Sequence, residues 1–204
     1  SLDVSNNTAL TELSCHTNQL SSLDVSNNTA LTTLKCSSTL LTSLDVSNNT
    51  ALTSLNCNTN QLSSLDVSNN TALTELSCYQ NQLTSLNLSN NALLEYLETS
   101  NNALTSLNVS NNPALTYLTC HTNQITGLDV SANTALIGLF TLSNLLPSLD
   151  VSNCSSLQFL RCGDNQLTSL DLRNGSNYNL QLYTQSNTNL LCIDVEDTTW
   201  SNNN

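Results

Sequence analysis

The chain is built from a repeat of 21 residues. The tripeptide Leu-Asp-Val, or a close variant of it, begins at nine positions with this constant spacing: Leu2, Leu23, Leu44, Leu65, Leu86, Leu107, Leu128, Leu149 and Leu170. A tenth copy starts at Ile193, 23 residues after the ninth, which predicts a small insertion near residues 173–179. Repeats of this length cannot bury an apolar face alone, so they stack and share one core. We therefore expect one solenoid domain over residues 1–204, with nine coils and a C-terminal cap at 190–204.

Within each coil, two short segments alternate apolar and polar residues. In ELSCH, Leu13 and Cys15 alternate with polar neighbours, and in SLDVS, Leu23 and Val25 do the same. Successive side chains of a β-strand point to opposite faces, so these four residues point inward. The pattern predicts an all-β solenoid with two short parallel strands per coil. The intervening SNNTA is expected to form the turn, because Asn tolerates the left-handed backbone conformation.

Both segments fit the pattern L-x-x-L-x-[LCV]-x-x-N, as in residues 10–18 and 20–28. Over residues 2–192 the chain resembles the leucine-rich-repeat family, and in particular its bacterial subclass with a 21-residue double motif, called the IRREKO type. Residues 189–203 are similar to the ends of such arrays in secreted bacterial proteins. The resemblance implies a right-handed solenoid with parallel sheets, secreted or exposed on the cell surface. It also implies a ligand-binding or adhesion module rather than an enzyme.

Asparagines recur at two places in the repeat. One column is expected to satisfy backbone groups at the bend after the Leu-Asp-Val segment, and the other at the bend after the Cys segment, because buried polar groups need hydrogen-bond partners. The first contains Asn7, Asn28, Asn49, Asn70, Asn91, Asn112 and Asn133, and the second contains Asn18, Asn60, Asn81, Asn102, Asn123, Asn144 and Asn165.

Six of the eight cysteines share one inward position: Cys15, Cys36, Cys57, Cys78, Cys120 and Cys162. Equivalent residues of neighbouring parallel strands lie about 4.8 Å apart, farther than the Cβ atoms of a disulfide. Thr99 and Thr141 occupy the same position in two coils, so we interpret the site as one that needs a small buried side chain. Cys154 and Cys192 fall outside the column, and a disulfide involving one of them is a possible staple near the C-terminal end.

The charge of the chain excludes several classes of partner. Three basic residues stand against 15 acidic ones, a formal net charge of −12. A nucleic-acid-binding protein needs Lys and Arg to displace counterions from phosphates, so DNA and RNA are not expected partners. No run of 18 apolar residues is present, and no membrane insertion is expected. The chain opens at Ser1 within a repeat and shows no signal peptide, which suggests a mature or trimmed fragment.

The outward positions of the Cys-containing segment vary from coil to coil, while the rest of the repeat is constant. A constant frame with one variable face is typical of a repeat scaffold that builds a binding surface. In coil order, the three outward columns are Glu12, Thr33, Ser54, Glu75, Tyr96, Tyr117, Gly138 and Phe159; then Ser14, Lys35, Asn56, Ser77, Glu98, Thr119, Phe140 and Arg161; then His16, Ser37, Asn58, Tyr79, Ser100, His121, Leu142 and Gly163.

The aromatic residues of this face gather in coils four to eight. Tyrosine offers contact area and a polar tip, which suits a polysaccharide or a protein partner. The alternative is drift of the repeat, with rings covering irregular coils. Exposed aromatic clusters usually have a purpose, so we predict ligand contacts at Tyr79, Tyr96, Tyr117, His121, Phe140 and Phe159.

The Leu-Asp-Val segment carries an outward column of carboxylates, which begins Asp3, Asp24, Asp45 and Asp66. Carboxylates about 4.8 Å apart repel one another, so a bound calcium ion would relieve the column and stiffen a structural spacer. Calcium takes six to eight oxygen ligands, and one column flanked by serines offers few. The other interpretation is that each Asp accepts hydrogen bonds from the neighbouring Ser and keeps the surface soluble.

Ordered threonines give a further alternative, because ranks of Thr on a solenoid of low charge resemble the surfaces of ice-binding proteins. Here the two columns lie three residues apart across a bend rather than two apart on one strand. They are Thr8, Thr29, Thr50 and Thr71, and Thr11, Thr32, Thr53, Thr74 and Thr116.

Catalysis is not expected. His16 and His121 are the two histidines and stand five coils apart, so no set of nucleophile, base and orienting group forms around either. The sequence predicts a non-catalytic extracellular module that binds a polysaccharide or a protein through its variable face. Ice binding and a calcium-stiffened spacer remain the alternatives.

Overall fold

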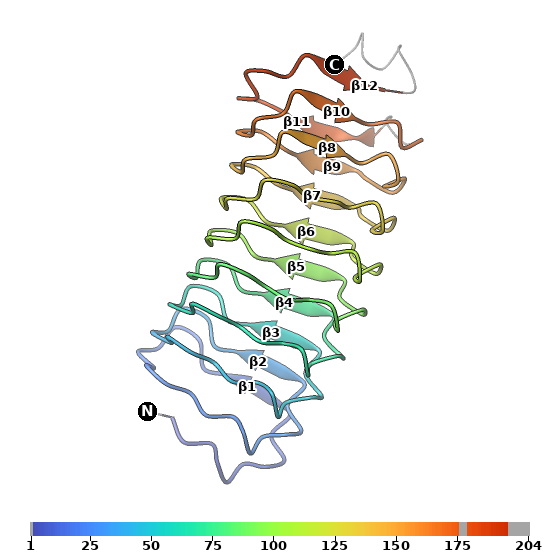
Figure 1. Ribbon diagram of the computed structural model, residues 1–204. Helices are drawn as coiled ribbons and strands as arrows, with labels where there is room; N and C mark the ends of the chain where they lie inside the picture. The colour runs from blue at the N-terminus through green and yellow to red at the C-terminus, as the bar shows by residue number, and fades with distance from the viewer. Residues whose placement is uncertain (1, 176–178, 196–204) are drawn as a thin grey trace.

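The computed structural model describes residues 2–175 and 179–195, and residues 196–204 of the expected cap lie outside this part of the chain. The chain winds into a rod of stacked coils (Figure 1). Its strands are three residues long: β1 Glu12–Ser14, β2 Thr33–Lys35, β3 Ser54–Asn56, β4 Glu75–Ser77, β5 Tyr96–Glu98, β6 Tyr117–Thr119, β7 Gly138–Phe140, β8 Ser148–Asp150, β9 Phe159–Arg161, β10 Ser169–Asp171, β11 Gln181–Tyr183 and β12 Cys192–Asp194. In the described part, no helix is long and apolar enough to cross a membrane.

The Cys-containing segments form one parallel sheet of nine strands in the order β1-β2-β3-β4-β5-β6-β7-β9-β11. Glu12 pairs with Thr33, and the same 21-residue register runs from β1 to β9. Beyond β9 the register lengthens, because Phe159 pairs with Gln181. The predicted solenoid of 21-residue coils is confirmed, and so is the extra length in the ninth coil.

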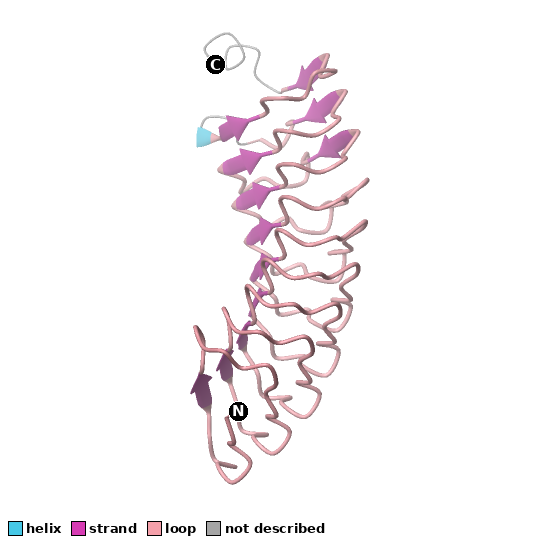
Figure 2. Cartoon of the chain, turned by 90° about the vertical axis from the view of Figure 1, so that its left-hand side faces the viewer, coloured by secondary structure: helices cyan, strands magenta, loops and turns pink. Residues whose placement is uncertain are grey.

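A second strand was expected in the Leu-Asp-Val segment of every coil, and the structure shows it in only some of them. These strands form a three-stranded parallel sheet, in the order β12-β10-β8, at the C-terminal end. In coils one to seven this segment is not a strand, and side chains such as Asn27, whose Nδ2 donates to the carbonyl of Ser5 at 3.4 Å, link neighbouring coils instead. Figure 2 shows the rod bowed with the nine-stranded sheet on its concave side. A continuous ladder holds that side together, while the opposite side is free to spread.

The core is made of columns of Leu, Val and Cys that run the length of the rod. In the second coil, Leu31, Leu34, Cys36 and Leu41 are completely buried. The Asn columns confirm their predicted role. Asn28 Nδ2 donates to the backbone carbonyls of Val4 at 3.0 Å and Asn7 at 2.8 Å, both in the preceding coil. The six Asn side chains from Asn28 to Asn133 in this column are fully buried.

All eight cysteines are free thiols, so the possible staple at Cys154 or Cys192 is wrong. Cys154 occupies a position of the first Asn column, where its Sγ faces the carbonyl oxygens of Val130 at 3.8 Å and Asn133 at 3.7 Å. Cys192 is exposed on β12. Burial raises the thiol pKa to about 12 in Cys78 and Cys120. The column is therefore protonated and behaves as a set of small apolar side chains.

The left-handed backbone lies in a different turn from the one expected. In SNNTA, the N–H of Asn7 donates to the carbonyl of Val4 at 2.9 Å, which closes an ordinary turn, and no residue there has a positive φ. One residue per coil is instead left-handed just after the strand of the concave sheet: Thr17, Ser38, Thr59, Gln80, Asn101, Thr122, Ser143, Asp164 and Ser186. In eight of these nine coils the next residue is an Asn that holds the bend, and after Ser38 it is Thr39, whose hydroxyl donates to the carbonyl of Cys36 at 3.1 Å. Asn18 Nδ2, for example, donates to the carbonyls of Cys15 and His16.

Candidate functional site

The three variable columns line the concave face of the nine-stranded sheet. Their side chains project from the strands opposite to the Leu and Cys columns, so they contribute little to the core. On β1, for example, Glu12 and Ser14 are exposed while Leu13 packs inward. The side chains on this face can therefore vary between coils without loss of the fold.

Two aromatic rings close over Gly138 at the centre of this face. A Cβ atom at Gly138 would lie 2.6 Å from Cδ1 of Tyr117 and 2.9 Å from Cε2 of Phe140. Real Cβ atoms do not approach other atoms this closely, so any larger residue would displace a ring. Glycine at 138 thus allows Tyr117 from β6 and Phe140 from β7 to meet. Phe159 follows Gly138 in the same column, since the two residues are paired between β7 and β9.

Arg161 stands between two aromatic rings in the next column. Its Cζ lies 5.6 Å from the ring centroid of Phe140 and 5.0 Å from that of Tyr183, within the range of cation–π attraction. Tyr183 is 44% exposed, and its importance was not recognised from the sequence. The cause is the insertion near residues 173–179. A strict 21-residue count from Arg161 reaches residue 182, whereas β11 pairs Tyr183 with Arg161.

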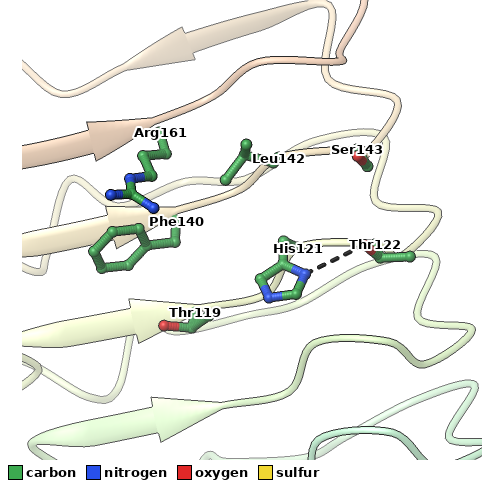
Figure 3. A pocket seen from close by; sticks show the side chains of 7 residues that line it. All are labelled: Thr119, His121, Thr122, Phe140, Leu142, Ser143 and Arg161. Atoms are coloured by element: carbon green, nitrogen blue, oxygen red, sulfur yellow. Dashed lines mark hydrogen bonds between the residues drawn. The ribbon is translucent and has the colours of Figure 1, made fainter. Parts of the chain in front are cut away.

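A hollow of about 460 Å³ opens on this face across β6, β7 and β9. Figure 3 shows the side chains around it, with Arg161 above Phe140 and His121 beside Thr122. The Nδ1 of His121 lies 3.2 Å from the hydroxyl oxygen of Thr122. Burial lowers the pKa of His121, with Glu98 acting in the opposite direction, so the imidazole is neutral at pH 7. The residues that line the hollow are Thr119, His121, Thr122, Phe140, Leu142, Ser143 and Arg161.

The opposite end of the same surface is acidic. Glu98 Oε2 accepts hydrogen bonds from the hydroxyls of Ser77 at 3.0 Å and Tyr96 at 3.4 Å. Burial raises the pKa of Tyr96, and the charge of Glu98 raises it further. Glu75 likewise accepts from the hydroxyl of Ser54 at 3.0 Å. The concave face therefore carries carboxylates near β4 and β5 and a guanidinium at β9.

The six aromatic and histidine positions predicted from sequence occupy different parts of this face. His121 and Phe140 line the hollow, and Tyr117 adjoins it over Gly138. Tyr96 pairs in register with Tyr117. Tyr79 lies two coils before His121 in the third column and does not line the hollow.

The Asp column on the convex side has a structural role. Asp3 Oδ1 accepts the backbone N–H of Ser5 at 2.9 Å, and Asp24, Asp45 and Asp66 accept that of the serine two residues on in the same way. Asn87 makes the equivalent bond at 3.1 Å, so the position requires an acceptor rather than a charge. Within the described residues, no group of three His, Cys, Asp or Glu side chains is placed to hold a metal ion.

One of the two threonine columns is also tied to the backbone. The hydroxyl of Thr32 donates to the carbonyl of Thr11 at 3.1 Å, and Thr53 and Thr74 repeat this bond to the preceding coil. Thr116 donates to the carbonyl of Glu95. Thr8, Thr29, Thr50 and Thr71, in the other column, are exposed. The column that contains Thr32, Thr53 and Thr74 thus links neighbouring coils along the rod by hydrogen bonds.

The stacked 21-residue coils, the concave parallel sheet and the Asn ladders define a leucine-rich-repeat fold. Solved structures with this architecture match the chain. InlJ of Listeria monocytogenes, whose functional domain includes a cysteine ladder, is 30% identical over 93% of this chain and 54% of its own, with a TM-score of 0.59. The internalin inlF of the same organism is 27% identical over 96% and 64%, with a TM-score of 0.78.

A third similar structure is the leucine-rich-repeat ectodomain of the receptor kinase GASSHO1/SCHENGEN3 from Arabidopsis thaliana, in complex with CASPARIAN STRIP INTEGRITY FACTOR 2. It is 26% identical over 83% of this chain and 25% of its own, with a TM-score of 0.75. The chain thus spans less than two thirds of each of these three proteins. No protein-family model matches it, and no curated protein does.

Proposed function

We propose that the chain is a non-catalytic recognition module that holds an extended segment of a protein partner on its concave face. The observation that carries this proposal is the hollow between β6 and β9, where Phe140, His121 and Arg161 converge on an exposed sheet. Ligand sites combine apolar and aromatic walls with a few polar groups that fix orientation, and this hollow has both. Aromatic residues and Arg are also the side chains most enriched at the centres of protein interfaces.

The similar structures support the same function. One of them is a leucine-rich-repeat ectodomain in complex with a partner named as an integrity factor. The two Listeria proteins extend the likeness to internalins. We further propose that the chain is a single solenoid of the double-motif subclass and part of a secreted or cell-surface bacterial adhesion protein.

A polysaccharide is the second candidate ligand. Tyr183 is 44% exposed and Tyr96 is 37% exposed, so both rings can offer a face to a sugar. The two candidates differ in the side chains that binding needs, because a neutral polysaccharide would depend on the rings and would not depend on the charge of Arg161.

The proposal can be tested with a displayed library of random twelve-residue peptides, selected against the whole chain. Affinities of the enriched peptides are then measured by titration calorimetry for the wild type and for Phe140→Ala. The control is Leu93→Ala, which also truncates an apolar side chain but at a site that is 57% exposed and outside the concave sheet. We expect Phe140→Ala to weaken binding by about tenfold or more, because interface centres carry most of the binding energy.

Retention of full affinity by Phe140→Ala would contradict the assignment of the face. A selection that enriches no peptide, combined with binding of soluble glycans that is lost in Phe140→Ala, would favour the polysaccharide candidate instead.

A further inference from the structure

One column of the concave face carries opposite charges at a fixed separation. Glu98 on β5, Thr119 on β6, Phe140 on β7, Arg161 on β9 and Tyr183 on β11 are successive partners in the sheet register. A carboxylate and a guanidinium therefore lie three strand steps apart, with Phe140 and the hollow between them.

The separation of these two charges matches a short length of extended chain. Neighbouring strands are about 4.8 Å apart, so three steps place Glu98 and Arg161 about 14 Å apart along the rod. An extended peptide rises about 3.3 Å per residue and covers this distance in about four residues. A peptide lying along the rod axis could contact both groups at once.

Arg161 is available to bind an anion. It is exposed, and within residues 2–175 and 179–195 no carboxylate lies at ion-pair distance from it. The rings of Phe140 and Tyr183 hold its guanidinium, which can bind a carboxylate through two parallel hydrogen bonds. Such a group is unusual here, since the chain has three basic residues and a net charge of −12.

Glu98 is likewise held in place by its neighbours and has a carboxylate oxygen available to bind a cation. Its Oε2 is held by the hydroxyls of Ser77 and Tyr96, while in the described part of the chain its Oε1 has no hydrogen-bond donor. The surrounding acidic field attracts a positive side chain to this end of the face. The same field repels a purely acidic partner, so a carboxylate at Arg161 is favoured when the segment also carries a cation.

We infer that the bound segment is an extended peptide with a Lys or Arg side chain at Glu98 and a carboxylate at Arg161, about four residues apart. An apolar side chain between them fills the hollow beside Phe140. This inference rests on the proposed function and specifies the chemistry of its ligand.

The test uses the same random twelve-residue library, selected in parallel against the wild type, Arg161→Gln and Glu98→Gln. The matched controls are Lys35→Gln and Glu12→Gln, which remove one charge each from exposed positions of the same sheet, on β2 and β1. Wild-type selection should enrich peptides with a basic and an acidic residue four positions apart. Selection against Arg161→Gln should lose the preference for an acidic residue, and selection against Glu98→Gln should lose the preference for a basic one. Each substitution should lower the affinity for the peptides selected on the wild type about tenfold.

The outcomes separate this inference from the proposed function. Enriched peptides that need Phe140 but lack the charge pair, or that bind Arg161→Gln and Glu98→Gln as well as the controls, would overturn the inference and leave the proposed function standing. Peptides whose binding is insensitive to Phe140→Ala would overturn both.

Discussion

The thiol of Cys154 lies 3.7 Å from the carbonyl oxygen of Asn133, at the position where an Asn side chain of the preceding coils would donate a hydrogen bond. Asn133 itself donates at 2.8 Å to the carbonyl of Asn112. A thiol is a weak donor, so the ladder is weakest at this step.

Cys154→Asn should therefore raise the free energy of unfolding by about 1 kcal/mol, because it restores an amide donor to two buried carbonyls. Urea unfolding followed by circular dichroism gives the measurement. The matched control is Cys120→Asn, which places the same amide in the apolar thiol column and should cost about 2 kcal/mol or more. If both substitutions destabilise the protein equally, the ladder position of residue 154 is wrong.

Gly138→Ala should disturb the aromatic centre of the concave face. The new Cβ would meet Tyr117 at 2.6 Å, and we expect a loss of about 1–3 kcal/mol as the ring is displaced. Tyr117→Ala removes the shortest of these contacts and leaves that with Cε2 of Phe140 at 2.9 Å, so Gly138→Ala should cost less in that background. A double-mutant cycle on unfolding free energies measures this coupling, and strictly additive effects would show that the two residues do not touch.

The Asp column should make stability sensitive to acid. Hydrogen bonds from Ser26, Ser47 and Ser68 hold the carboxyl pKa values of Asp24, Asp45 and Asp66 below their ordinary value of 3.8. The folded state therefore binds protons less readily than the unfolded state. This contribution is present above pH about 4 and is lost as the pH falls through the folded-state pKa values.

A triple variant with Asn at positions 24, 45 and 66 keeps the acceptor, as Asn87 does naturally, and removes the titration. Its melting temperature should stay close to that of the wild type at pH 7 and should fall less as the pH is lowered from about 5 to below 3.8, where the contribution of these carboxyls is lost. The corresponding Ala variant loses the acceptor and should melt lower at both pH values. An equal acid-induced loss in the wild type and the Asn variant would refute the linkage.

Ser38→Gly should stabilise the chain. Ser38 has a φ of 53°, a conformation that costs a residue with a Cβ roughly 1–2 kcal/mol and glycine almost nothing. Part of the gain is offset by the larger entropy of glycine in the unfolded chain, so about 0.5 kcal/mol should remain. Ser43→Gly is the control, because Ser43 is exposed and has no positive φ, and it should lose stability. Equal effects at the two positions would argue against strain at Ser38.

Much of the fold could be predicted because the repeat presents the same information in every coil. The alternation around Leu13 and Cys15 placed the strands of the concave sheet, and the Asn columns placed the ladders. The alternation around Val25 predicted a second strand in each coil, but alternation shows only which side chains point inward. Whether neighbouring segments pair as strands also depends on the distance between coils on the convex side. That distance follows from the curvature of the rod, which the nine-stranded sheet determines.

The candidate site was predictable only in part. The aromatic residues drew attention to Tyr117 and Phe140 because they interrupt a polar surface. Sequence alone could not show that Gly138 makes room for their rings, since this depends on the rotamers of two neighbouring coils. Tyr183 was missed because the insertion changes the register between β9 and β11. The role of Arg161 could not be predicted either, because it depends on the ring of Tyr183 lying beside the guanidinium.

The most direct test of the concave face as the binding surface is a chemical-shift map of the isotope-labelled chain, titrated with a peptide enriched in the selection. If the peptide binds the concave face, backbone amide signals shift most in residues 117–122, 138–143 and 159–161, with little change along the Leu-Asp-Val segments of coils one to four. Shifts concentrated on the Asp column of the convex side would contradict this assignment, because the partner would then bind opposite the hollow beside Phe140.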